Sequence, residues 1–413
     1  MTSVLKSVKT CSFIRITIIN KVILLNTKEK DLQYIMHTYG RYDVALKSGK
    51  GATAYDEDGK KYIDVSSGIG VNSLGYCDEG WVNAVSKQAG TIQHMSNYFY
   101  SEQASNLAEK LCNLTGFAKV CFGNSGAEAN ECAIKLARKY SFDKYGADRN
   151  EIITLKNSFH GRTVTTLSAT GQDVFHNYFF PFTEGFLHAE ANDIDALKNA
   201  VTDKTCAVMF EVIQGEGGVN ILDKEYVQSL VKFCNEKDIL VIIDEVQTGV
   251  GRTGKLFAFE NFDVKPDLIT VAKGIGGGLP IGLCMCNDKL KDVLSPSTHG
   301  TTFGANPVVC AGANYVLDKV SDPKFLEEVN AKGAYLEEKL SKLDDVKSVR
   351  RMGLMVGIEL KDGDAHDIAI KCVENGLLII TAKSLLRMLP PLTISYEEID
   401  SAVEILEKTL AEN

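Results

Sequence analysis

Short apolar segments that alternate with helical stretches constrain the fold of this chain more than any other feature. The segments are rich in Val, Ile and Leu and read KVCFGN, EIITLKN, CAVMFEVI, ILVIIDEV and DLITVAK. Stretches with helical periodicity separate them, among them residues 127–145 and 224–237. Strands that are buried on both faces and alternate with helices are typical of parallel sheets covered by helices. The pattern therefore predicts an α/β fold built on a mainly parallel sheet.

The pattern changes towards both ends of the chain. Near the start, KGATAYDEDGKKYIDVSSG alternates apolar and polar residues around a D-x-x-G turn, which predicts a hairpin. From about residue 311 helical segments with short strands dominate, and a final helix begins near Ser395. We interpret these two parts as one smaller α+β domain. The predicted division is an extension over 1–36, small-domain segments over 37–75 and 306–413, and a large domain over 76–305.

The first 36 residues stand apart because basic residues interrupt their apolar content. Arg15 and Lys21 break it up, and the apolar run Val22–Leu25 is too short for a secretory signal. A transit peptide would carry more Arg and Ser. We expect a poorly ordered extension upstream of a true start at Met36.

Composition excludes several classes of partner. A net charge of −9 argues against binding to nucleic acid or to an anionic membrane. No apolar run is long enough to predict a transmembrane helix. The 11 cysteines include no C-x-x-C pair, which favours reduced thiols in the cytoplasm over a disulfide framework.

One lysine follows a predicted buried strand and precedes a glycine-rich stretch, in DLITVAKGIGGGLPIG. Gly274 and Gly276 begin a dinucleotide-binding fingerprint, but Leu279 stands where its last glycine is needed and Pro280 follows. A nicotinamide-dependent dehydrogenase is therefore disfavoured. Most strand-end lysines are surface residues, so the role of Lys273 depends on which residues stand at the ends of the other strands.

Ser125 and Glu128 follow the KVCFGN segment with the S-x-x-E spacing of a capping box. A long helix that begins there presents free N–H groups and a positive dipole end, which favour an anion such as phosphate. Most capping boxes bind nothing, so this signal is weak alone.

Two further strand ends carry polar or aromatic residues. Asp244 ends a strand of apolar residues, where a carboxylate is costly unless it meets a cation. After EIITLKN, Phe159 and Arg162 stand on either side of His160 and Gly161. His160 is as easily a buried structural histidine as a functional one. A surface loop is the simpler interpretation of Phe159 and Arg162 taken alone, whereas Asp244 taken alone favours a functional and a structural role equally.

Together these residues meet the requirements of one cofactor, pyridoxal phosphate. Lys273 can form a Schiff base with its aldehyde, and Asp244 can keep its pyridine nitrogen protonated. The helix after Ser125 can hold the phosphate, and Phe159 can stack on the ring.

The chain resembles the class III aminotransferases, which have the aspartate aminotransferase fold (fold type I). The resemblance extends from Tyr39 to the C-terminus and rests on ordered motifs: FGNSGAEANECAIKLARKY, SFHGRT, EVIQGEGGV, IIDEVQTGVGRTG, AKGIGGGLPIG, HGTTFGANP and RMLPPLTIS. It implies a large domain with a seven-stranded, mainly parallel sheet, and a smaller α+β domain.

The resemblance also implies the cofactor-binding residues. Lys273 would hold the cofactor covalently and act with Asp244 in catalysis, while Thr302 would reach the phosphate of the partner subunit in a homodimer. The implied cofactor-binding set is Ser125, Gly126, Ala127, Phe159, Asp244, Glu245, Val246, Gln247, Lys273 and Thr302.

The implied substrates are N2-acetylornithine as amino donor and 2-oxoglutarate as acceptor, with glutamate as product, as in arginine biosynthesis. Arg162 would bind the distal carboxylate, and Glu216 would neutralise Arg387 until the α-carboxylate of glutamate displaces it. Gly68 stands where ornithine aminotransferases carry a bulky tyrosine, which leaves room for an acyl group. The implied substrate-binding residues are Tyr39, Gly68, Arg162, Glu216, Thr301 and Arg387; no metal is implied.

Alternatives within the same fold remain open. Aminotransferases for ornithine, succinylornithine and 4-aminobutyrate, and glutamate-1-semialdehyde aminomutase, share most of these motifs. A catalytically silent regulator of the same fold is disfavoured because Lys273, Asp244, Phe159 and Arg162 are all present.

Overall fold

The computed structural model describes residues 25–412. The chain divides between Ala45 and Leu46 into two compact units. In the first unit, helix α1 (Thr27–Tyr34) begins with a capping box. The side chain of Asn26 accepts from the N–H of Glu29 at 2.9 Å, and Oε2 of Glu29 accepts from the N–H of Asn26 at 2.8 Å. Residues 27–34 of the expected extension are therefore helical, and the N-x-x-E spacing of Asn26 and Glu29 was the sequence signal for this helix; the extension itself stays a prediction. Residues 1–24 lie outside the described residues.

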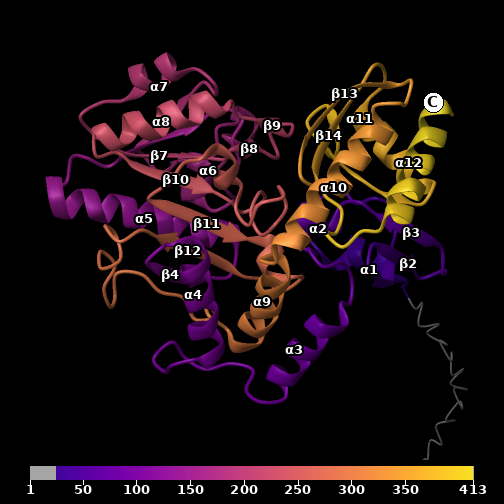
Figure 1. The fold of residues 1–413 in the computed structure, drawn as a ribbon, viewed down its shortest axis with the longest axis horizontal. Coiled ribbons are helices and arrows are strands. Elements are labelled where there is room, and N and C mark those ends of the chain that lie inside the picture. The colour runs from indigo at the N-terminus through magenta and orange to yellow at the C-terminus, as the bar shows by residue number, and fades with distance from the viewer. Residues whose placement is uncertain (1–24, 413) are drawn as a thin grey trace, which may run out of the picture. The chain divides into compact units, whose positions relative to one another are not determined.

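The second unit is built on a seven-stranded sheet (Figure 1). All neighbouring strands are parallel except β12, which is antiparallel to both of its neighbours. The predicted mainly parallel sheet is thus confirmed, although two of its strands, β6 and β12, were not identified in the sequence. The strands in spatial order are β4 (Lys119–Gly123), β12 (Gly282–Cys286), β11 (Leu268–Ala272), β10 (Leu240–Asp244), β7 (Thr205–Phe210), β5 (Glu151–Leu155) and β6 (Phe186–Ala189).

Helices bury this sheet, as the apolar strands require. Every residue of β7, β10 and β11 is buried. Helix α5 (Gly126–Tyr145) packs along β4, β11 and β12, and α8 (Lys224–Glu236) packs against β10. Both helices were predicted to within two residues. The remaining helices of this region are α3 (Glu79–Ala89), α4 (Glu102–Thr115), α6 (Val164–Ala169) and α7 (Ile194–Ala200).

Of two smaller four-stranded sheets, one combines segments from both ends of the second unit (β1-β2-β3-β15) and the other is formed by C-terminal strands alone (β13-β14-β17-β16). The hairpin of β2 (Thr53–Asp56) and β3 (Lys61–Asp64) is confirmed, and β3 pairs in parallel with β15 (Leu377–Leu378). In Figure 1 these indigo strands accordingly lie beside the yellow C-terminal helix α12. This pairing supports a small domain completed from both ends, whose boundaries stay predictions. The other elements are β1 (Leu46–Lys50), α2 (Ser67–Gly70), β8 (Ile213–Gln214), β9 (Asn220–Ile221), α9 (Pro307–Val320), α10 (Pro323–Leu340), β13 (Val346–Met352), β14 (Met355–Leu360), α11 (Ala365–Glu374), β16 (Ile380–Ala382), β17 (Leu385–Met388) and α12 (Tyr396–Ala411).

Within residues 25–412 none of the helices combines the length and the apolarity that crossing a bilayer requires.

Candidate active site

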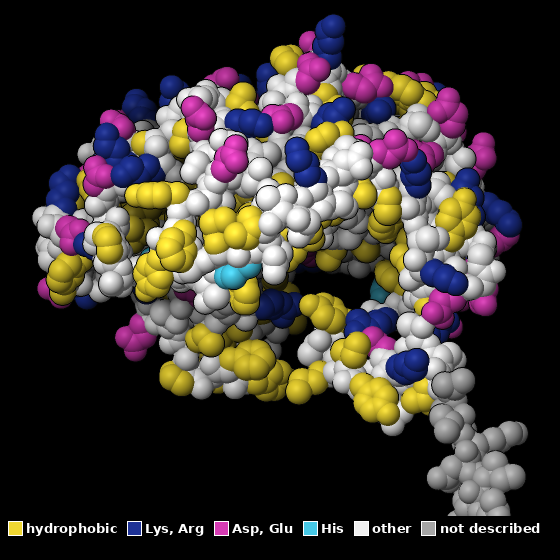
Figure 2. Space-filling view, turned by 90° about the horizontal axis from the view of Figure 1, so that it is seen from below, with side chains coloured by type: hydrophobic (Ala, Val, Ile, Leu, Met, Phe, Trp, Pro, Cys, Tyr) yellow, Lys and Arg dark blue, Asp and Glu magenta, His cyan; other side chains and the backbone are white. Residues whose placement is uncertain are grey.

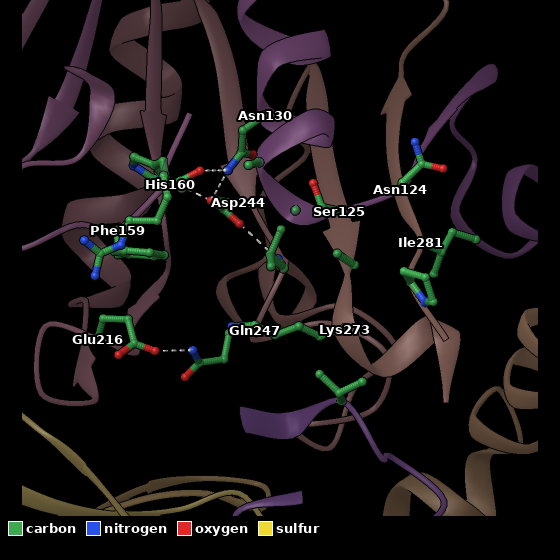
Figure 3. Close-up of a pocket in the computed structure, with 18 of the residues that line it drawn as sticks. Asn124, Ser125, Asn130, Phe159, His160, Glu216, Asp244, Gln247, Lys273 and Ile281 are labelled. Atoms are coloured by element: carbon green, nitrogen blue, oxygen red, sulfur yellow. Dashed lines mark hydrogen bonds and ion pairs between the residues drawn. The ribbon is translucent and has the colours of Figure 1, made fainter. Parts of the chain in front are cut away.

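A cavity of about 480 Å³ lies beyond the carboxyl ends of the central strands (Figure 3). Parallel strands bring their carboxyl ends to one edge of a sheet, which is where ligands bind in such folds. Residues that follow β4, β5, β7 and β11, and the last residue of β10, all line the cavity. The predicted site residues among its lining are Ser125, Gly126, Ala127, Phe159, Arg162, Glu216, Asp244, Val246, Gln247 and Lys273.

The carboxylate of Asp244 is fixed by donors on both of its oxygens. Oδ2 accepts from Nδ2 of Asn130 and from Nδ1 of His160, each at 2.8 Å, and Oδ1 accepts from the N–H of Val246 at 3.0 Å. Asn130 also donates to the carbonyl of His160 at 2.7 Å. Asp244 is buried, so these bonds hold it in one orientation against the cavity. Asn130 was missed in the sequence, although its place one turn into α5 put it on the face that begins with Gly126.

Lys273 begins the turn that follows β11 and has a φ of 47°. No hydrogen bond or ion pair joins its Nζ to another of the described residues. Burial lowers the pKa of the Lys273 amine. The negative charge of Glu216 raises it in part, but the positive charge of Arg387 lowers it again. A lowered pKa makes a larger share of the amine neutral and therefore able to react as a nucleophile or base.

The glycines after Lys273 serve packing in this structure. Gly277 has a φ of 59°, and a Cβ built there would lie 2.7 Å from Nε1 of Trp81. Trp81 donates from that nitrogen to the carbonyl of Gly276 at 3.2 Å. The glycine-rich stretch thus receives a side chain of α3, while Gly278 lines the cavity.

The first turn of α5 forms another wall of the cavity. Ser125 caps the helix by accepting from the N–H of Glu128 at 3.2 Å, but the predicted capping box is only half formed. Oε2 of Glu128 instead accepts from Nδ2 of Asn124 at 2.7 Å and from its backbone N–H at 2.5 Å. Because the first N–H groups of a helix have no partner within it, those of Gly126 and Ala127 are available to an anion.

Arg387, which is buried, and Glu216, which is half-buried, form an ion pair at the edge of the cavity. Nη1 of Arg387 lies 2.7 Å from Oε1 of Glu216, and its Nη2 lies 3.1 Å from Oε2. Gln247 joins them, accepting from Nη1 of Arg387 at 3.1 Å and donating to Oε1 of Glu216 at 3.2 Å. Burial alone would raise the pKa of the Glu216 carboxyl, but Arg387 holds it below its ordinary value. Glu216 is therefore an anion that neutralises Arg387.

Arg162 is exposed at the mouth of the cavity and stacks on aromatic rings. Its Cζ lies 4.1 Å from the ring centroid of Phe175 and 5.6 Å from that of Phe159. Within residues 25–412 no carboxylate pairs with it, so its guanidinium is available to an anionic group of a ligand.

Glu211 is a cavity residue that the sequence reasoning missed. It is fully buried just after β7, and its Oε2 accepts from the N–H of Phe159 at 2.9 Å. Burial raises the pKa of the Glu211 carboxyl well above its ordinary value, and the charge of Asp244 adds to the effect. Its position at a strand end, like that of Asp244, was the signal that could have identified it.

Other predicted site residues do not line the cavity. Glu245 points into the fold, where its carboxylate accepts from Thr248 Oγ1 at 2.6 Å and from the N–H of Phe259 at 2.8 Å. Neighbouring side chains at a strand end face opposite ways, so Glu245 does not line the cavity with Asp244, and its contact with the cofactor stays a prediction. Gly68 is exposed near Val71, which does line the cavity.

Thr301, Thr302 and Tyr39 also lie outside the lining. Oγ1 of Thr301 accepts from Nδ2 of Asn124 at 2.9 Å, and Thr302 is exposed. Tyr39 belongs to the first unit, where Arg41 lies 5.8 Å from its ring. The roles of these three residues stay predictions.

The residues present fit pyridoxal phosphate. The cavity holds a buried amine without a partner among the described residues, a carboxylate fixed for a ring nitrogen, and the free start of a helix for a phosphate. A Cβ at Gly126 would lie 2.7 Å from Cγ1 of Val246, so only glycine lets this helix start approach the strand-end turn. Lys273, Asp244 and the turn at Gly126 would hold the group.

Comparison with known proteins points to the same family. Residues 34–410 match the family model described as Aminotransferase class-III. The acetylornithine aminotransferase of Haemophilus ducreyi is 51% identical over 387 residues, covering 93% of this chain and 98% of that protein. The corresponding protein of Caldanaerobacter subterraneus is 49% identical, covering 92% and 98%.

Solved structures are similar over the same extent. The structure of N-acetylornithine aminotransferase from Stenotrophomonas maltophilia has a TM-score of 0.81 and 35% identity, covering 91% of this chain and 97% of that one. A structure of ornithine aminotransferase from Toxoplasma gondii, described with partial occupancy of PLP at its active site, has a TM-score of 0.87 and 33% identity, covering 92% and 93%.

Proposed function

Since the chain belongs to the class-III aminotransferase family, whose members depend on pyridoxal phosphate, we propose that it transfers the terminal amino group of N2-acetyl-L-ornithine to 2-oxoglutarate. The products are N-acetyl-L-glutamate 5-semialdehyde and L-glutamate, which is a step of arginine biosynthesis. The ion pair between Glu216 and Arg387 carries this proposal, because it lets one cavity accept two unlike substrates.

When bound, pyridoxal phosphate supplies an aldehyde that takes up the amino group and a ring that withdraws electrons from the adjacent carbon. Lys273 is the residue that accepts and returns a proton at its Nζ, and its lowered pKa suits this role. Asp244, held in one orientation by Asn130 and His160, would pair with the ring nitrogen.

The two substrates differ in where their carboxylates lie. Glutamate carries a carboxylate beside its reacting amine, whereas the terminal amine of N2-acetylornithine is far from its carboxylate. Arg387 binds the former, and Glu216 neutralises Arg387 when the latter occupies the cavity. Arg162 at the mouth binds the distal carboxylate of either substrate by paired hydrogen bonds.

Donor selectivity rests on space for the acyl group. Gly68 carries no side chain, and it lies next to the cavity residue Val71. Succinylornithine is a secondary donor on this proposal, and free ornithine and 4-aminobutyrate are poorer ones.

A donor panel tests the proposed function. The purified holoenzyme is assayed with 2-oxoglutarate and each of N2-acetylornithine, N2-succinylornithine, ornithine and 4-aminobutyrate. We expect the highest kcat/KM for N2-acetylornithine. A higher value for free ornithine would refute the acyl pocket, and the absence of glutamate formation with every donor would refute the transaminase.

We further propose a homodimer whose two cavities each receive Thr302 from the partner subunit. An exposed aromatic patch supports it: Tyr98, Tyr100 and Phe303 are 95%, 102% and 63% exposed. Nδ2 of Asn97 donates to the carbonyls of Thr301 and Gly304 at 3.0 and 3.1 Å, which joins the two parts of the patch. Figure 2, which views the molecule from below, shows that hydrophobic side chains are exposed on that face. Large exposed apolar patches are typical of protein interfaces.

We place the enzyme in the cytoplasm. All ten cysteines of the described residues are free, which supports a reducing compartment.

A further inference from the structure

A cluster of thiols and one imidazole lies outside the candidate active site, where β4, β12 and α5 meet. Sγ of Cys121, Sγ of Cys132 and a ring nitrogen of His299 all lie within 4.8 Å of one another. The thiol of Cys132 also interacts with that of Cys284.

The fold brings these residues together from four separate segments. Cys121 on β4 and Cys284 on β12 are opposite one another in the antiparallel ladder. Cys132 lies in the second turn of α5, which packs against both strands. His299 comes from the segment that precedes Thr301.

Cysteines often serve as small apolar core residues, and this explains part of the cluster. Cys132 and Cys284 are buried in the core that α5 forms with the sheet. Apolar packing does not account for the position of His299, one ring nitrogen of which lies within 4.8 Å of both thiols. Cys121 and His299 are only half buried, so the cluster can be reached from solvent.

Lys135 already connects α5 to the segment that contains His299. Its Nζ donates to the carbonyl of Thr298 and lies 3.0 Å from Nδ1 of His299. Lys135 follows Cys132 by three residues and therefore lies on the same face of the helix. Its exposed side chain can turn into solvent without breaking the core.

We propose that Cys121, Cys132 and His299 form a site for a thiophilic divalent cation such as Zn²⁺. Two thiolates and an imidazole are ligands that Zn²⁺ prefers, at about 2.3 Å for sulfur and about 2.0 Å for nitrogen. Tetrahedral geometry at those lengths separates the ligand atoms by about 3.8 Å, so the cluster has to contract by at most about 1 Å. Binding releases the two thiol protons to solvent, and water or Cys284 takes the fourth position.

A bound ion would connect the 298–301 segment to β4 and α5. The same segment contributes Thr301, whose Oγ1 accepts from Asn124 at the start of α5. A Zn²⁺ ion bound there would therefore make the 298–301 segment beside the candidate active site more rigid. The ion itself would not contact the cavity.

Zinc titration of the full-length holoenzyme tests this site. Competition with a chromophoric chelator should give one Zn²⁺ per chain, and Cys132→Ala should weaken binding by about 100-fold or more, since a ligand is lost. Cys310→Ala removes a buried thiol from α9, away from the cluster, and should leave the affinity within about twofold. If Cys132→Ala does not fold, Cys121→Ala at the half-buried position replaces it.

X-ray absorption at the zinc edge of the loaded holoenzyme gives an independent readout. We expect two or three sulfur ligands at about 2.3 Å and at least one nitrogen ligand at about 2.0 Å. A shell of nitrogen and oxygen only would overturn the proposal. So would unchanged affinity in Cys132→Ala, or a Cys121–Cys132 disulfide in mass spectra of a protein that binds no zinc.

Discussion

The guanidinium of Arg387 holds the carboxylate of Glu216 by two hydrogen bonds, Nη1 to Oε1 at 2.7 Å and Nη2 to Oε2 at 3.1 Å. These residues are 171 positions apart and come from the turn after β8 and from strand β17. Their pairing neutralises the buried positive charge of Arg387. The carboxylate of an incoming substrate can displace Glu216 from it. On our account, this exchange is what lets one cavity serve both substrates.

Removing Glu216 should slow the two half-reactions unequally. In Glu216→Ala, Arg387 is left as an unpaired buried charge when N2-acetylornithine binds, so the donor half-reaction should fall by on the order of 100-fold. The glutamate half-reaction should change far less, because its carboxylate pairs with Arg387. Single-turnover spectra with each substrate measure the two rates, and the exposed Glu225→Ala is the matched control. Equal slowing of both half-reactions would disprove the switch.

Adding bulk at Gly68 should change donor preference. Gly68→Tyr fills the proposed acyl pocket, so the ratio of kcat/KM for N2-acetylornithine to that for ornithine should fall at least about tenfold. Gly68 has a φ of 64°, so any side chain there is strained. Gly68→Ala carries the same strain without the bulk and should keep the ratio near that of the wild type. If the two variants show the same ratio, the acyl group does not reach Gly68.

The amide of Asn130 should matter for cofactor retention. Asn130→Ala removes one of the donors that fix Asp244 and should weaken pyridoxal phosphate binding by about 1–3 kcal/mol, or roughly five- to 150-fold. Equilibrium titration of apoenzyme with the cofactor gives the dissociation constant, and the exposed Asn199→Ala serves as control. An unchanged constant in Asn130→Ala would show that His160 alone suffices to hold Asp244.

Glu245 should make the folded state less stable as pH rises. Burial raises the pKa of its carboxyl from an ordinary 4.5 to about 7, against the hydrogen bonds from Thr248 and Phe259 that favour the ion. The folded state therefore binds more protons than the unfolded state between these values, and stability falls as pH increases through that window. Above about pH 7 the free energy of unfolding has fallen by about 3 kcal/mol in total, at about 1.36 kcal/mol for each unit of pKa difference.

Urea unfolding of wild type and Glu245→Gln at several pH values isolates this contribution. The difference in unfolding free energy between the two proteins should shift in favour of the variant from about pH 4.5 to about pH 7 and then stay level. A difference that is constant with pH would mean that Glu245 titrates normally.

The residues at strand ends could be predicted from sequence because parallel strands present their carboxyl ends together. Lys273 and Asp244 each follow a continuous apolar run, so their convergence needed no knowledge of helix packing. The strand-end argument reached His160 only as a residue with a possible structural role, and it could not reach Asn130 on α5. Asn130 and His160 meet Asp244 from positions 114 and 84 residues away, which depends on how α5 lies on the sheet.

Local geometry explains where the structure departs from simple sequence patterns. Glu245 follows Asp244 directly but faces Thr248 and Phe259 rather than the cavity, because consecutive side chains at a strand end point to opposite sides. The S-x-x-E pattern predicted a full capping box, whereas Asn124 offers two donors that Glu128 reaches instead. Both outcomes depend on competition between nearby groups, which spacing alone does not resolve.

Attachment of pyridoxal phosphate to Lys273 is the central claim, and borohydride reduction of the purified holoenzyme followed by peptide mapping tests it most directly. Reduction makes the bond between the cofactor and its lysine permanent. We predict that the peptide containing Lys273 carries the mass of the reduced cofactor and that Lys273→Ala yields no labelled peptide and no transaminase activity. Label on a different lysine of the wild type, or an active Lys273→Ala enzyme, would contradict the account.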